Sequence, residues 1–206
     1  MSGTFPISSA KFDSFNFKSN QTTIISKSDS GKKLARQIDN QRWSFSISII
    51  TSTRDNVYGE LMAFIVKQRG SKENFQIIPT EISSARGTET NILYVGGIHT
   101  AGDTTIVIDN FASDTAGRLK AGDVIKFANH SKVYMVVSDV TPSSGSATVT
   151  IEPPLVSSLA DNEQVTYDNV PFTVYITNDL QEFGVVGNNK DGNLLYKYEL
   201  DVEEAL

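Results

Sequence analysis

One short segment constrains the fold of this chain more than any other. In residues 43–49, WSFSISI, every odd position is a large apolar residue and every even position is serine. This period of two is typical of a β-strand with one buried and one exposed face. Burial of the four apolar side chains contributes on the order of 6 to 12 kcal/mol gross, at about 1.5 to 3 kcal/mol each. The segment therefore predicts a sheet with one apolar face and one serine-rich face.

A helical pattern follows this strand. Four apolar residues fall at positions i, i+3, i+4 and i+7, which lie on one face of a helix. They are Tyr58, Leu61, Met62 and Ile65. Residues 52–55 have the spacing of a capping box, and Gly70 stands where a helix-terminating glycine is expected. One amphipathic helix is predicted over residues 54–69.

The remaining segments of the first 80 residues are less regular. Residues 22–26 and 34–38 have strand patterns and flank a turn cluster at 28–31, which predicts a hairpin. Residues 75–79 form a strand that stops at a proline. Residues 1–20 have no clear period, so we expect an extended arm that docks its phenylalanines elsewhere. These are Phe5, Phe12, Phe15 and Phe17.

Residues 81–170 differ in character, because they consist of short apolar segments joined by turn residues. The expected strands are residues 92–95, 104–109, 123–128, 132–139, 147–152 and 163–167. Strands of this length and spacing predict a small closed barrel.

The last segment, residues 171–206, contains two to three strands, including 172–177 and 194–202, with a hairpin turn on Asp191 and Gly192. A segment this short cannot bury a core of its own, so it should return to the first segment. We therefore predict a mainly β fold. Residues 1–80 and 171–206 form a discontinuous domain with one helix, and residues 81–170 form an inserted barrel.

The composition and the charge of the chain exclude several classes of site and of binding partner. The chain has no cysteine, which excludes disulfides and thiolate metal sites. Residues 81–170 hold eleven acidic and five basic residues and so carry the whole formal charge of −6. An acidic barrel is a poor phosphate binder, and we expect no nucleic-acid binding. Without a signal-peptide core or a membrane-spanning apolar run, we expect a soluble protein made in the cytosol.

Candidate chemical motifs fail on their spacing. The run around Gly192 lacks the carboxylates of a calcium loop, because its first and twelfth positions are Gly187 and Tyr198. His99 and His130 are the histidines, and no G-x-S-x-G motif accompanies them. A hydrolase would need a serine nucleophile beside one of the two. We predict no catalytic residue, no metal ligand and no cofactor, and we expect His130 at a hairpin tip.

Aromatic residues in the barrel leave carbohydrate binding open, because sugars stack on exposed rings. The candidates are Tyr94, Phe111, Phe127, Tyr134 and Tyr167. Phe127 and Tyr134 lie in apolar strands, which favours a place in the core.

Three segments carry a resemblance to a known family: QRWSFSIS at 41–48 with the helix after it, LKAGDVIKFANHSKVY at 119–134, and the exit strand IEPPL at 151–155. With these segments the chain resembles the small two-domain distal tail (Dit) proteins of long-tailed, non-contractile phages of the Tequintavirus kind. The resemblance covers most of the chain in order, except residues 1–20 and 89–102. It implies an inserted barrel of the oligonucleotide/oligosaccharide-binding (OB) type.

The resemblance also implies a function. The chain is expected to be a structural virion protein, not an enzyme, that forms a homohexameric ring at the tail tip and joins the tail tube protein to the receptor-binding hub of the baseplate. It would assemble in the cytoplasm of the host bacterium, without membrane insertion. The barrel would project outward, open to tail fibre proteins or a host glycan. The alternative function is a host-surface carbohydrate-binding module of the tail tip.

Overall fold

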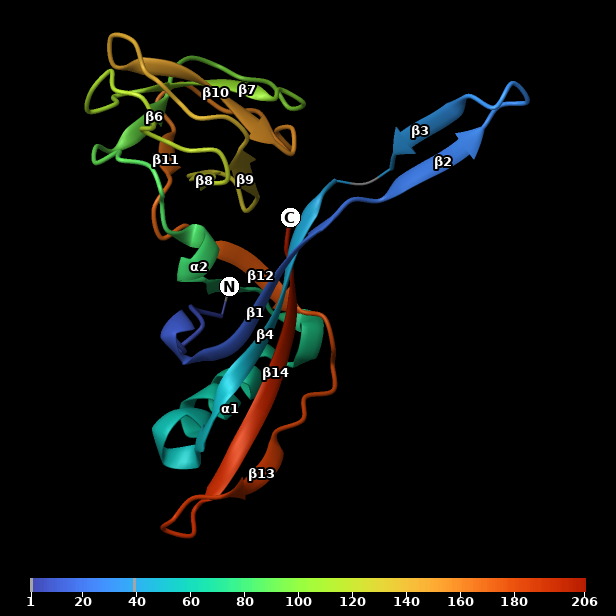
Figure 1. The fold of residues 1–206 in the computed structure, drawn as a ribbon, viewed down its shortest axis with the longest axis vertical. Coiled ribbons are helices and arrows are strands. Elements are labelled where there is room, and N and C mark those ends of the chain that lie inside the picture. The colour runs from blue at the N-terminus through green and yellow to red at the C-terminus, as the bar shows by residue number, and fades with distance from the viewer. Residues whose placement is uncertain (1, 39) are drawn as a thin grey trace. The chain divides into compact units, whose positions relative to one another are not determined.

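The computed structural model describes residues 2–38 and 40–206; residues 1 and 39, which fall in the predicted N-terminal arm and first domain, lie outside the described residues. Strands make up 42% and helices 12%, so the fold is mainly β, as the sequence predicts. The chain consists of two compact units, and Figure 1 labels their helices and strands. The first comprises residues 1–11, 73–174 and 205–206, and the second residues 12–72 and 175–204.

The second unit is built on a long central strand. Its strands are β1 (Phe12–Asn20), β2 (Thr23–Lys27), β3 (Lys33–Gln37), β4 (Arg42–Thr53), β13 (Gly184–Asn188) and β14 (Leu194–Glu204). Strand β4 pairs antiparallel with β1 on one side and with β14 on the other, and β13 pairs with β14. Phe45 lies opposite Phe17 on β1 and Val202 on β14, so the three side chains share one face.

The two faces of β4 differ as the sequence predicts. Trp43, Phe45, Ile47 and Ile49 are each at most 5% exposed. The opposite face carries Ser44, Ser46 and Ser48, together with acidic residues of β14 that lie opposite them. Glu203, Asp201 and Glu199 are these partners. The predicted sheet with one apolar and one serine-rich face is confirmed.

The predicted helix forms in two parts. A π-helical turn, Arg54–Tyr58, leads into α1, Gly59–Gln68. Tyr58 is fully buried, and its hydroxyl donates to the carbonyl of Ile50 at 3.2 Å, which fixes the start of the helix on β4. The capping box expected at residues 52–55 is wrong, because the residue that precedes the helical turn is Thr53 and not Ser52, and Thr53 makes no side-chain hydrogen bond to the helix.

The end of the helix also differs from the prediction. Arg69, with φ 57°, is the left-handed residue that terminates α1, in place of Gly70. Gly70 follows with φ 69°. A Cβ at this position would lie 2.5 Å from Oδ1 of Asp179, so lack of space favours glycine there.

The N-terminal segment is more ordered than an extended arm. A single 3-10 turn, Ser9–Lys11, precedes β1. Phe15 and Phe17 lie on β1, with ring centroids 5.5 Å from Phe45 in both cases, and Phe12 stacks on Phe15. A register shift after Phe12 breaks the alternation of the strand, which is why the sequence shows no period. These aromatic residues pack against their own sheet.

The predicted hairpin of residues 22–38 is confirmed. Strands β2 and β3 pair antiparallel with each other as a separate two-stranded sheet. Every residue of both strands is exposed. The hairpin therefore has no buried face in the described structure.

The first unit contains a closed six-stranded barrel with the order β10-β7-β6-β11-β8-β9. Its strands are β6 (Leu93–Val95), β7 (Thr105–Asp109), β8 (Val124–Phe127), β9 (Val133–Val136), β10 (Ser146–Glu152) and β11 (Gln164–Thr166). All six coincide with segments expected to be strands. The buried apolar cluster inside it runs from Leu93 to Val165 in the sequence. The barrel fits an OB-like fold.

Strand β5 (Phe75–Ile77), helix α2 (Thr80–Ser83) and β12 (Phe172–Ile176) lie next to the barrel in the sequence. β12 pairs antiparallel with β5, and the chain passes from the first unit to the second after Val174. A 3-10 turn, Gly70–Lys72, precedes β5.

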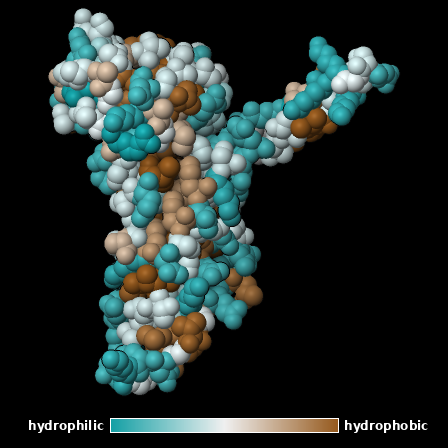
Figure 2. Space-filling model, in the orientation of Figure 1, coloured by the Kyte–Doolittle hydropathy of each residue, from teal (hydrophilic) through white to brown (hydrophobic). Residues whose placement is uncertain are grey.

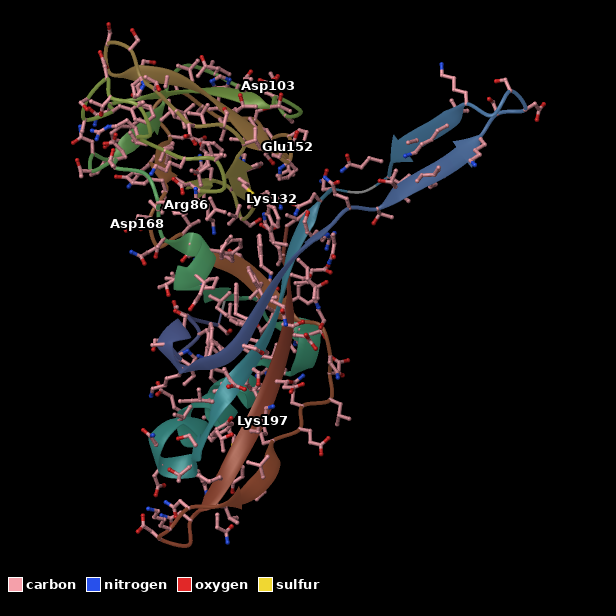
Figure 3. The ribbon with its side chains drawn as sticks, in the orientation of Figure 1. Arg86, Asp103, Lys132, Glu152, Asp168 and Lys197 are labelled. Carbon is pink, nitrogen blue, oxygen red and sulfur yellow. The ribbon has the colours of Figure 1, made fainter. Side chains whose placement is uncertain are left out.

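The chain segments that lead into and out of the barrel lie side by side. The amide of Val170 donates to the carbonyl of Ser83 at 3.2 Å, and the amide of Ala85 donates to Asp168 at 3.0 Å. Figure 3 shows Arg86 and Asp168 on these two segments. Adjacent ends are what an inserted domain requires; the boundaries at residues 81 and 170 stay a prediction.

A fragment of residues 82–170 tests these boundaries. Because its apolar core is drawn from its own strands, we expect the fragment to unfold in one cooperative transition when heated. Circular dichroism and calorimetry would measure this. A fragment with strand content but no cooperative melt would contradict the insertion.

Candidate interaction surfaces

Both histidines of the barrel serve local structure. His130 lies in the β8–β9 turn, as predicted, but its side chain is turned inward and the residue is 6% exposed. Its Nδ1 lies 2.8 Å from the Tyr134 hydroxyl, which also accepts the amide of Val156. His99 accepts the amide of Val107 at Nε2, and its Nδ1 lies 3.8 Å from Asp103.

Burial governs the protonation of His130. Loss of hydration lowers the pKa of His130 below its ordinary value, and this effect outweighs the opposing influence of the Ser158 backbone and of the charge on Glu163. In the neutral ring, Nδ1 can accept the hydrogen of the Tyr134 hydroxyl. Protonation of Nδ1 removes that acceptor inside the barrel.

The aromatic candidates for sugar stacking are mostly interior. Phe127 and Tyr134 are fully buried, as expected, and Phe111 is 6% exposed. Tyr167 packs against the same core, and its hydroxyl donates to the carbonyl of Asn91 at 2.8 Å. Tyr94, on β6, is half-buried.

Buried carboxylates hold the segment that enters the barrel. Glu89 accepts the amides of Thr90, Asn91 and Ala112, and its Oε2 lies 3.0 Å from Nε of Arg118. Arg118 in turn donates to the carbonyl of Thr88 at 2.8 Å. Glu89 is therefore one acidic residue of the barrel segment that serves the interior structure and does not add to the charge of the surface.

Asp123, just before β8, is a second buried carboxylate that accepts backbone amides. It is 1% exposed and accepts the amides of Arg86, Gly87 and Lys120. Gly87 must be glycine, because a Cβ there would lie 2.1 Å from the carbonyl oxygen of Arg118.

A cleft of about 540 Å³ lies in the first unit, lined in part by Gln76, Lys126 and Asn129. The ammonium of Lys126 donates to the carbonyl of Pro171 at 3.0 Å and to the hydroxyl of Thr173 at 3.1 Å. The cation of this cleft is thus used in local hydrogen bonds.

A second cleft, of about 460 Å³, lies in the other unit, beside β14. Leu180 and Val186 line it and are 75% and 56% exposed. Its charged lining residues are Glu182, Lys197, Glu199 and Asp201, and Lys197, labelled in Figure 3, pairs with Glu199 at 3.6 Å. The cleft combines apolar surface with a surplus of negative charge.

The residues that the structure describes contain no group of three or more histidine and carboxylate side chains placed to hold a metal ion. Within the same residues, no helix has the length and apolar character needed to cross a membrane.

The comparison with protein families gives one match, and it covers the barrel. Residues 81–170 match the family model described as distal tail protein pb9, B domain. No curated protein matches the chain. The family match supports a structural role for this protein as a component of a phage tail.

Sequence reasoning missed the cleft beside β14 and the buried contacts of His130, Glu89 and Asp123. A turn residue such as His130 gives no sequence signal of burial. The motif Ala121-Gly122-Asp123 hints at a turn whose carboxylate caps backbone amides. The cleft depends on residues of a loop and a strand that no motif links.

The Glu89→Ala variant tests the buried ion pair. Removing this carboxylate leaves Arg118 buried without its partner, and we expect the free energy of unfolding to fall by about 3 to 5 kcal/mol. Chemical denaturation would measure the loss. Glu152→Ala, at an exposed barrel carboxylate, is the control and should change stability by about 0.5 kcal/mol or less. Equal effects of the two substitutions would contradict the assigned role.

The lowered pKa of His130 predicts a pH dependence. Between the folded pKa and the unfolded value of about 6.5, the unfolded chain binds more protons, so stability is fully present above that value and falls as the pH decreases. The melting temperature should drop between about pH 7.5 and pH 5.5. His130→Gln should show a shallower drop, and an unchanged slope in this variant would refute the assignment.

Proposed function

We propose that this protein is the distal tail protein of a siphophage of the Tequintavirus kind, and that it forms a ring, hexameric in the resembling family, at the tail tip. The ring joins the tail tube protein to the receptor-binding hub of the baseplate. Residues 1–80 and 171–206 form the ring, and the barrel of residues 81–170 projects from it. The protein acts by assembly and not by catalysis.

The observation that carries this proposal is the match of residues 81–170 to the B domain of distal tail protein pb9. A second observation agrees with it. The hairpin of β2 and β3 exposes apolar residues that a solitary subunit leaves in water, including Ile24, Ile25 and Leu34 at 55%, 58% and 51%. Ile24 and Leu34 share one face of the hairpin, and exposed apolar residues grouped on one face are typical of interaction surfaces.

The alternative, a host-glycan module, depends on exposed aromatic rings in the barrel. Phe111, Phe127 and Tyr134 are buried and offer no ring face to a sugar. Tyr94 and Tyr167 remain, and the hydroxyl of Tyr167 is engaged by Asn91. No specific observation favours the glycan, and ring assembly is the better supported function.

Deletion of the gene distinguishes the two functions by the stage at which virion production fails. A tail-tip ring is laid down before the tube polymerises, so electron micrographs of null lysates should contain heads without tails. The intact gene supplied in trans should restore tails. Complete tailed particles that fail only to bind cells would contradict the proposal and support the glycan alternative.

Barrel deletion is the matched control for this experiment. A chain that joins Thr80 to Pro171 through a short linker keeps the proposed ring-forming domain, so it should still restore tube assembly. Failure of this variant, despite normal folding, would assign assembly to the barrel.

A further inference from the structure

We infer that the apolar face of the β2–β3 hairpin of one copy docks in the acidic cleft beside β14 of a neighbouring copy. The inference rests on the proposed ring, and it names the two surfaces that meet. Both surfaces belong to the second unit of the chain.

The register of the hairpin sorts its side chains onto two faces. Ile24 lies opposite Arg36, and Ser26 lies opposite Leu34. Opposed residues of antiparallel strands share a face, and alternate residues of one strand return to it. Ile24, Leu34 and Arg36 therefore lie on one face, and Ile38, whose amide donates to Thr22 at 3.1 Å, extends it.

This face is incomplete in a single subunit. Ile24, Leu34 and Ile38 are 55%, 51% and 52% exposed. A two-stranded hairpin is marginally stable in water unless a third strand or another element covers a hydrophobic face. Figure 2 shows apolar residues gathered on the hairpin between hydrophilic ones. The hairpin has the composition of a structural element that lacks its packing partner.

Charge adds a second requirement. Residues 22–38 hold four basic residues and one acidic residue. Arg36 lies opposite Ile24 and so places one of these cations on the apolar face, whereas Lys27 and Lys33, which lie opposite each other, belong to the other face. A partner for the apolar face therefore needs apolar surface for Ile24 and Leu34 and a carboxylate for Arg36.

The cleft beside β14 meets both requirements. It is lined by residues of the loop before β13, of β13 and of β14, and the buried residues Ile176 and Tyr198 are also among its lining residues. Leu180 and Val186 supply exposed apolar surface at the cleft.

The charge of the cleft is opposite to that of the hairpin. Its lining holds three acidic residues and one basic residue. Because Lys197 already pairs with Glu199, Glu182, which is exposed, is the carboxylate best placed to receive Arg36. The apolar and charged parts of the two surfaces are complementary in kind.

A second copy of this chain is the occupant that these observations favour. Both halves of the contact occur on one chain, and the hairpin is exposed and so is not seated in its own cleft. Two different surfaces that meet between identical copies make a head-to-tail contact, which leads to a ring when the rotation closes.

The cysteine-free sequence allows a direct test. We would prepare Leu34→Cys and Val186→Cys proteins, mix them, and add a short bismaleimide cross-linker. Both residues are about half exposed, so neither substitution should disturb folding. The expected product is a covalent dimer of one variant with the other, in excess over dimers of either alone. Ile98→Cys, at a barrel residue that is 79% exposed, is the matched control and should not cross-link to Leu34→Cys.

The doubly substituted chain, Leu34→Cys with Val186→Cys, extends the test. Head-to-tail contacts should give a ladder of covalent oligomers on a denaturing gel, ending at the number of copies in a closed ring. A ladder that stops at the dimer would overturn the head-to-tail contact.

A charge exchange provides an independent measurement. Arg36→Glu should weaken self-association by about tenfold or more in analytical ultracentrifugation, because it places two carboxylates together. Glu182→Arg in the same chain should restore it. Cross-linking no greater than with Ile98→Cys, or an Arg36→Glu protein that associates like the wild type, would overturn the inference.

These outcomes separate the inference from the proposed function. If the wild-type protein assembles and the null mutant lacks tails, but Leu34 and Val186 do not cross-link, the ring stands and its contact lies elsewhere. If the cross-link forms and null lysates contain complete tails, the contact stands and the tail-tip function fails.

Discussion

The alternation of apolar residues and serines along β4 is the constraint on which the second unit depends. This strand has a neighbour on each side, and its pairing sets the faces of both β1 and β14. A slip of one residue would expose every apolar side chain of the strand. The register is therefore fixed by burial, and the helix is in turn anchored to β4 through the hydroxyl of Tyr58.

The barrel buries its apolar side chains in a different way, because its sheet closes on itself. Its apolar residues meet inside a sheet without free edges, and its buried carboxylates, Glu89 and Asp123, receive backbone amides. The negative charge that argues against nucleic-acid binding thus has a partly structural origin. With both apolar cores satisfied, the β2–β3 hairpin and the cleft beside β14 stand out as incomplete surfaces.

Sequence patterns predicted elements wherever one period dominated. The strand at residues 43–49, the six barrel strands and the hairpin at 22–38 all followed from local patterns. Strand β1 was missed because the register shift after Phe12 removes its alternation. The capping box was wrong because the chain enters the helix through a π-helical turn, which forms no side-chain cap at Thr53. Contacts such as that of His130 with Tyr134 depend on tertiary packing, which a local pattern does not encode.

The β2–β3 hairpin differs from its sequence pattern in one respect, which is the burial of its apolar side chains. Its isoleucines and leucine have the pattern of strands that belong to a packed sheet, and the pairing forms as that pattern predicts. Yet every residue of both strands is exposed in the part of the chain that the structure describes. Sequences generally satisfy their local patterns in the final structure. The burial that this pattern demands must then come from outside the subunit, and the acidic cleft of another copy has the opposite charge and the apolar surface to supply it.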